Sequence, residues 1–349
     1  MTSLAFDLDR PAPPSARAVA GWLLLCAALV FAMAVIGAIT RLTESGLSMV
    51  EWKPLIGVLP PLSEAEWNRV FDLYRRTPEY RLHNAGMSLA AFKGIFWWEW
   101  FHRLWGHLIG AAFAGGLAWF WAQGRIARGL RRPLLGLLAL GGLQGVIGWF
   151  MVMSGLVDRP WVSPYRLALH LGMAVLIYAL LLRLALGVLE PVAASPPRPG
   201  LRKHAGAALA LVAVTMLWGA FTAGLDAGMI YDTWPLMGGQ VVPSDFLAQT
   251  PGWLNLFENP AAVQFVHRWL AVLTAAVVAG YSARALSAGL PPRGRRLAAA
   301  VGAVAVAQVA LGIATLLSVV AIPLAAAHQA GALVLVGLLV WARHDLAVA

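Results

Sequence analysis

The chain is poor in cysteine, in charge and in acidic residues, and each shortage excludes a class of protein. It has one cysteine, Cys26, among 349 residues, so it can form neither an internal disulfide nor a thiolate-bound metal cluster. Only 12% of its residues are charged, 16 of them acidic against 26 basic, whereas 60% are hydrophobic. No ordinary soluble domain needs such a composition, which therefore indicates a membrane protein.

Eight apolar stretches are long enough to cross a hydrocarbon layer about 30 Å thick, for which a helix needs about 20 residues. They are expected at residues 18–39, 96–121, 134–153, 166–189, 205–225, 262–283, 297–318 and 322–342. Residues 1–17 are polar and rich in proline, and no clear cleavage site follows the first stretch, which is expected to be retained. The sequence predicts an all-α polytopic membrane protein with eight transmembrane helices.

The distribution of basic residues predicts the orientation of these helices. Most lysines and arginines outside the long loops fall on one side: Arg10, Arg17, Arg125, Arg128, Arg131, Arg132, Arg198, Arg202, Lys203, Arg284, Arg293, Arg295, Arg296 and Arg343. The positive-inside rule makes this side cytoplasmic, so both termini are expected there. Since this topology accounts for most of the net charge of +10, no nucleic-acid partner is expected.

The chain is an internal duplication. Three pairs of segments match between its halves: residues 37–46 with 219–228, 101–105 with 266–269, and 144–148 with 308–312. Each half contains four spans, an even number, so the copies have the same orientation and are expected to be two tandem four-helix bundles. A pseudo-two-fold axis along the membrane normal would relate them.

The duplication also predicts the domain organisation. Residues 1–190 are expected to form the first half, with a long extracytoplasmic loop at 41–93 that contains a helix starting after Ser63. Residues 191–203, rich in proline at their start, are the expected linker, and residues 204–349 the second half. A second long loop, at 226–260, corresponds to the first.

Four histidines lie inside the apolar stretches at matching positions of the two halves: His102, His170, His267 and His328. Ionisable side chains inside a bilayer are costly and mark functional sites by default. At 1.5 Å per residue, each is expected roughly 8–10 Å below the outer end of its helix. A single histidine in a membrane helix is a structural hydrogen-bonding residue about as often as it is a functional one. Two pairs in register instead predict two sites in which imidazoles from facing helices bind one haem iron.

The neighbours of the histidines suggest further roles. Arg103 and Arg268, each directly after a histidine, are placed to reach haem propionates or to extend to lipid headgroups. Glu99 precedes His102 by three residues on the same helix face, where it can shuttle protons or simply favour the helix start.

The corresponding position in the second half is Gln264, and glutamine cannot exchange a proton. The first half is therefore expected to hold the chemical site and the second an electron-relay copy. His83, His107, His204 and His344 are assigned no role.

Residues 37–52, together with 99–106, resemble the haem A synthase family, in the branch shared by alphaproteobacteria and mitochondria, and the resemblance extends over nearly the whole chain. It implies that the protein oxidises the C8 methyl of haem O to the formyl group of haem A by successive hydroxylations. His102 and His170 would hold the substrate haem, whereas His267 and His328 would hold a haem b cofactor.

The resemblance also implies a location and partners. The protein is expected in a bacterial inner membrane, in contact with lipid, haem O, haem O synthase and cytochrome oxidase assembly proteins. Its product would serve haem-copper oxidases, and a homo-oligomer is left open.

Two other functions are compatible with parts of the pattern. A di-haem b-type cytochrome that oxidises quinol would use two histidine pairs, but such proteins commonly place their haems near both membrane faces. A transporter with tandem repeats would have broken helices and a midplane site, and no paired interruption is present in the spans. Haem A synthase is the preferred reading.

Overall fold

The computed structural model describes residues 14–51, 59–156, 161–190 and 198–347. Within these ranges the protein is all-α, and its extended backbone amounts to one isolated antiparallel bridge between Met237 and Gln240. Eight long helices form the body: α1 Pro14–Leu42, α4 Leu89–Ala122, α5 Arg128–Leu156, α6 Pro164–Leu189, α7 Pro199–Gly224, α9 Pro260–Ser287, α10 Pro292–Leu317 and α11 Ile322–Asp345. The short helices are α2 Glu64–Tyr74, α3 Pro78–Leu82, α8 Asn255–Glu258, η2 Ala227–Met229 and η3 Gly252–Leu254.

Each of the eight predicted apolar stretches lies in one long helix. Among the residues described, seven of these helices are long and apolar enough to cross a membrane. The eighth, α4, is the longest at 34 residues but carries several tryptophans, two histidines, Glu99 and Arg103, which lower its hydropathy. The structure is therefore that of a multi-pass helical membrane protein.

Several helices begin earlier than the hydrophobic pattern predicts because a proline opens them. Pro164, Pro199, Pro260 and Pro292 stand at the starts of α6, α7, α9 and α10. The N–H groups of the first helical turn have no partner within the helix, so a proline, which lacks this group, loses no hydrogen bond there. Its fixed φ also suits a helix start. Of the expected linker, residues 191–197 lie outside the described residues and 199–203 form the first turn of α7.

Helix α4 extends two turns beyond the predicted stretch because the first long loop packs on it. Ser88 caps its start by accepting a hydrogen bond from the Ala91 N–H at 3.2 Å. The rings of Phe92 and Phe96 then pack against the buried face of α2, formed by Trp67, Phe71 and Tyr74. The predicted helix after Ser63 is confirmed as α2, with the Ser63 hydroxyl accepting from Glu66 N–H.

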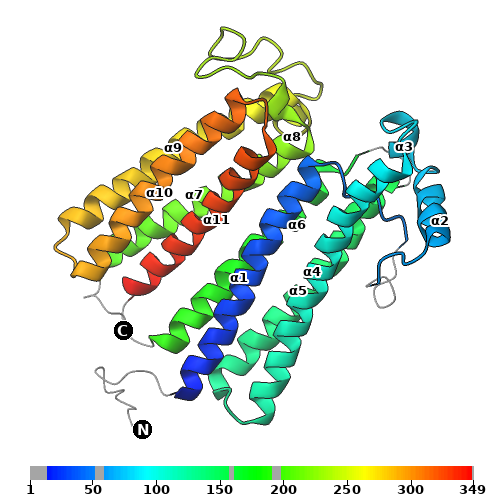
Figure 1. The fold of residues 1–349 in the computed structure, drawn as a ribbon. Helices are drawn as coiled ribbons and strands as arrows, with labels where there is room; N and C mark the ends of the chain where they lie inside the picture. The colour runs from blue at the N-terminus through cyan, green and yellow to red at the C-terminus, as the bar shows by residue number, and fades with distance from the viewer. Residues whose placement is uncertain (1–13, 52–58, 157–160, 191–197, 348–349) are drawn as a thin grey trace.

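The long helices run side by side, and both long loops lie at one end of them, together with α2, α3 and α8 (Figure 1). This end is called the loop end below. Helix α1 starts, and α11 finishes, at the opposite end (Figure 1). The contacts between helices follow the same order in both halves. A closed ring of contacts joins α1, α4, α5 and α6 in the first half, and a second ring joins α7, α9, α10 and α11 in the other. Helices α1 and α6 also contact α11, and α6 contacts α7.

Candidate functional site

Each of the four membrane histidines lies against a glycine of a neighbouring helix. A Cβ atom at Gly37 of α1 would lie 3.3 Å from Cε1 of His102 on α4, and one at Gly219 of α7 would lie 3.2 Å from Cε1 of His267 on α9. A side chain at either glycine would require the imidazole to shift by a few tenths of an ångström. The two sites are therefore built by the same helix contact, repeated.

The other two histidines are held in the same way. A Cβ atom at Gly148 of α5 would lie 3.0 Å from Cε1 of His170, and one at Gly312 of α10 would lie 2.9 Å from Cε1 of His328. All four glycines stand in the duplicated segments of the sequence. The repetition marks these glycines in the sequence, but only the packing shows that a histidine ring lies against each of them.

The histidines form two pairs. His102 lies near His170, and His267 lies near His328. The Nδ1 atom of each ring is buried and has no hydrogen-bond partner. Among the described residues no group of three or more histidine, cysteine, aspartate or glutamate side chains is placed to hold a metal ion. Paired imidazoles fit a metal whose remaining ligands come from a cofactor, such as haem iron.

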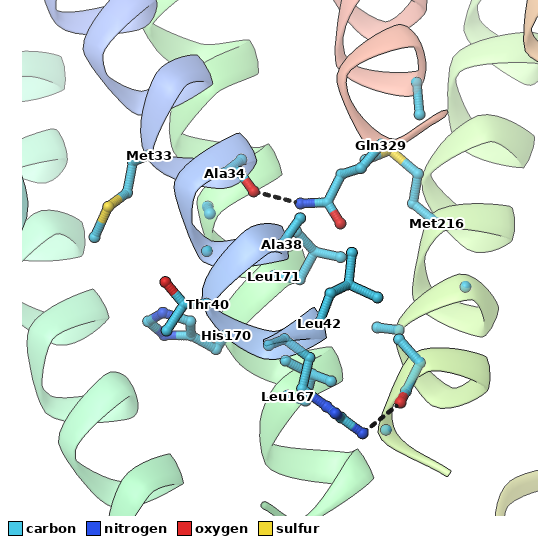
Figure 2. A pocket seen from close by; sticks show the side chains of 18 of the residues that line it. Met33, Ala34, Ala38, Thr40, Leu42, Leu167, His170, Leu171, Met216 and Gln329 are labelled. Carbon is cyan, nitrogen blue, oxygen red and sulfur yellow. Dashed lines mark hydrogen bonds between the residues drawn. The ribbon is translucent and has the colours of Figure 1, made fainter. Parts of the chain in front are cut away.

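A cavity of about 1500 Å³ joins the two pairs, and all four histidines line it. Cavities for one small molecule are typically ~300–1,000 Å³, so this one has room for more than one large ligand. Figure 2 shows α1 passing between His170 on one side and Gln329 and Met216 on the other. Gln329, the residue after His328, donates a hydrogen bond from Nε2 to the carbonyl of Ala34 at 2.6 Å and so ties α11 to α1 (Figure 2).

Two glutamines hold the backbone at the second histidine of each pair. Gln144 Nε2 donates to the carbonyl oxygen of His170 at 3.1 Å, and Gln308 Nε2 donates to that of His328 at 2.6 Å. These residues mark the repeat in the sequence, but the sequence did not indicate what they bind. They fix the height of each imidazole against the neighbouring helix.

The arginines after His102 and His267 clamp the long loops onto the helices. Arg103 donates to the carbonyls of Met49 and Glu51 at 2.8 and 3.1 Å. Arg268 makes the same contacts with Tyr231 and Thr233, at 2.8 Å each, and these residues are the repeat counterparts of Met49 and Glu51. Both arginines line the cavity as well, so contact with haem propionates stays a prediction.

Glu99 is buried, with 4% of its surface exposed, and it lines the cavity. It lies ten residues inside α4, so the alternative of a surface glutamate at a helix start is wrong. Its Oε1 accepts a hydrogen bond from Arg103 Nε at 2.7 Å. Gln264 is equally buried in the second half, where its Nε2 donates to the Tyr231 carbonyl at 2.9 Å. The two sites thus differ as the sequence predicts, with a buried carboxyl in the first half and a buried amide in the second.

The remaining histidines divide by position. His83 and His107 line the cavity at the first pair. His204 lies among other contacts, with Nδ1 3.0 Å from Arg284 Nη1 and Nε2 3.0 Å from the Val277 carbonyl. His344 Nε2 lies 3.0 Å from the Glu190 carbonyl. The last two belong to neither pair.

The apolar helices define a multi-pass membrane protein, and the two histidine pairs at its cavity are candidate cofactor sites. Residues 20–340 match the COX15-CtaA family of cytochrome oxidase assembly proteins, and the chain belongs to this family.

Curated relatives share the family's sequence over almost their whole length. The protein of Rhodospirillum centenum named "Heme A synthase" is 62% identical over 99% of this chain and 94% of its own. Relatives of the same name from Parvibaculum lavamentivorans and Nitrosospira multiformis are 50% and 45% identical, each over 95% of this chain and over 95% and 94% of their own.

Proposed function

We propose that the protein is a haem A synthase, which oxidises the C8 methyl group of haem O to a formyl group by successive hydroxylations. The observation that carries this proposal is a buried carboxyl, Glu99, beside one of two otherwise matching histidine pairs, in a chain 62% identical to a relative named "Heme A synthase". A second hydroxylation gives a gem-diol, which loses water to become the aldehyde. The product is haem A for haem-copper oxidases.

The two histidine pairs take different haems. His102 and His170 hold the substrate, because the proton-exchanging Glu99 lies in their half of the cavity. His267 and His328 hold a haem b cofactor, which fits the buried Nδ1 atom that lacks a partner in each ring and the glycines that receive the rings. When bound, haem b supplies one-electron transfer. Arg103 and Arg268, at the loop end of the cavity, are placed to bind propionates while they hold the loops.

The role of Glu99 follows from the chemistry at the methyl group. Each hydroxylation takes two electrons from the methyl group, which pass to an electron acceptor outside the chain, and releases protons when the inserted oxygen comes from water. A proton acceptor near the reacting carbon therefore speeds the reaction. Glu99 is this proton acceptor. Its carboxylate takes up the proton, and Arg103 holds the carboxylate in place through the 2.7 Å hydrogen bond. Gln264 cannot do this, which assigns the second site to electron transfer.

The architecture we propose is eight transmembrane helices in two tandem four-helix bundles, 1–190 and 204–349, related by a pseudo-two-fold axis along the membrane normal. The matching contact order of α1, α4, α5, α6 and of α7, α9, α10, α11 supports it. In the inner membrane the loop end would face outward, and both termini the cytoplasm. Haem O synthase and oxidase assembly proteins are the proposed partners.

Extraction and mass analysis of the haems from purified protein tests the function. We expect haem B together with haem O, the alcohol intermediate or haem A. Haem B alone, at two per chain, would instead identify a di-haem electron-transfer cytochrome and would contradict the proposal.

Cysteine labelling in intact cells tests the orientation. Cysteines introduced at Ser63 and Asp245, both in the loops at the loop end, should react with a membrane-impermeant reagent, and one at Arg295 on α10 should not. The native Cys26 is buried and should stay silent. The opposite pattern would place both haem sites near the cytoplasmic face.

A further inference from the structure

Glu79 is a buried carboxyl that has no role in the reaction proposed above. It lies on α3 in the first long loop, and only 5% of its surface is exposed. Its Oε2 atom is buried and has no hydrogen-bond partner. Burying an acid without full hydrogen bonding is costly, and each such group in a native protein calls for an explanation.

Glu79 lines the same cavity as Glu99. The wall at this end of the cavity is polar and also includes Glu44, Glu51 and His83, whereas deeper parts are lined largely by aliphatic side chains. The charges of Glu99 and Glu44 act on the Glu79 carboxyl, so the three acids are electrostatically coupled. One continuous space therefore connects the acid beside the histidine pair with an acid in the outer loop.

The surroundings of Glu79 suit a group that gains and loses a proton near neutral pH. Burial raises the pKa of Glu79 to about 8, against the lowering effects of the hydrogen bond with Tyr74 of α2 and of the Arg41 charge on α1. Glu44, after α1, and Glu99, on α4, raise the pKa further. A proton carrier works best when its pKa is close to the pH at which the protein operates.

The second half has no such chain of acids. The buried acids among the described residues are Glu79, Glu99 and Asp345, and Asp345 ends α11 at the end opposite the loops. Glu44 has a counterpart, Asp226, with the same left-handed backbone (φ 52° and 50°), which also lines the cavity but is exposed and ion-paired with Arg41 at 2.8 Å. Among the described residues, the buried acids that line the cavity are thus confined to the half that holds Glu99.

We propose that Glu79 is a proton-relay residue, which takes protons from Glu99 and releases them to water at the loop end. The proposal rests on the function proposed above, in which Glu99 accepts protons from the reacting methyl group. In the relay, an O–H bond of Glu99 breaks and one forms on the Glu79 carboxylate, and Glu79 then gives the proton to outside water. No electron moves. Glu44, Glu51 and His83 line the same cavity and offer hydrogen-bond partners to water that bridges the two carboxyls.

The test compares Glu79→Gln and Glu79→Asp with Glu64→Gln, a matched control on the exposed side of α2. The rate of haem A formation is measured from about pH 6 to pH 9. Since only ionised Glu79 can accept a proton, the wild-type rate should rise as the pH passes about 8. Glu79→Gln should be slower by about tenfold, below the ~10²-fold or more expected for the group at the reacting carbon, and should lack this rise. Glu79→Asp should restore it, and Glu64→Gln should match the wild type.

Two further measurements separate a relay from a merely structural role. The infrared band of a protonated carboxyl, in the difference between wild type and Glu79→Gln, should titrate with a midpoint near 8. Tyr74→Phe removes a hydrogen bond that lowers the pKa of Glu79, so it should move the rise in rate to higher pH. The Tyr74→Phe result does not depend on whether Glu79→Gln folds as well as the wild type.

The possible failures are distinguishable. Wild-type rate and pH profile in Glu79→Gln, or a carboxyl band with an ordinary midpoint near ~4.3, would overturn the relay while leaving haem A synthesis intact. A wild-type protein that forms no haem A would overturn the proposed function and the relay together.

Discussion

Replacing Glu99 with glutamine should abolish most haem A formation while both haems stay bound. The side chain keeps nearly the same shape but can no longer accept a proton, and the loss of a positioned proton-transfer group typically lowers rates by ~10²–10⁴-fold. Haem A yield and haem content, measured on the same purified sample, separate lost chemistry from lost binding. The same mass spectra report any accumulation of the alcohol intermediate.

The second half of the molecule indicates that this variant will fold. There a glutamine already occupies the matching position, and Arg268 beside it still holds the carbonyls of Tyr231 and Thr233. Arg103 in Glu99→Gln should keep its bonds to Met49 and Glu51 in the same way. The reverse change, Gln264→Glu, is the matched control and should be tolerated far better. Normal haem A yield in Glu99→Gln would refute the division of labour between the halves.

Alanine at His267 or His328 should remove most of the haem B absorbance and lower the thermal unfolding temperature. Each substitution deletes one of the two proposed iron ligands, and a protein that loses a tightly bound cofactor also loses the stability that binding contributes. His204→Ala is the control, because that ring does not line the cavity. A full haem B complement in either ligand variant would show that the assignment is wrong.

A milder variant tests the geometry of the same site. In Gly312→Ala the new methyl would lie 2.9 Å from Cε1 of His328, so the ring must shift. Overpacking of this kind costs about 1–3 kcal/mol, and we expect an altered haem B spectrum with reduced occupancy. Gly136→Ala on α5, where nothing lies within 4 Å of the added carbon, should leave the spectrum unchanged. Identical spectra in the two variants would contradict the glycine–histidine packing.

The sequence by itself determined the class of the protein, the eight helical stretches and the four histidines. Hydropathy over about 20 residues is a local property, and a helix satisfies its own backbone hydrogen bonds, so a membrane helix can be recognised without knowing its neighbours. The duplication also predicted that the histidines form two pairs, because residues at matching positions of two copies lie at matching places in the two bundles. It also singled out Glu99 against Gln264 before any contact was known.

Only the tertiary structure decided which residues surround these histidines. The roles of Gly37, Gly148, Gly219 and Gly312 depend on a ring supplied by another helix, and a glycine in a helix carries no mark of such a partner. The sequence suits Arg103 equally to lipid or haem, and only the structure shows that it binds the loop carbonyls. Glu79 gave no signal in the sequence, because its burial depends on how the first long loop packs on the long helices. Loop positions are set by contacts between distant parts of the chain, and a local pattern does not encode them.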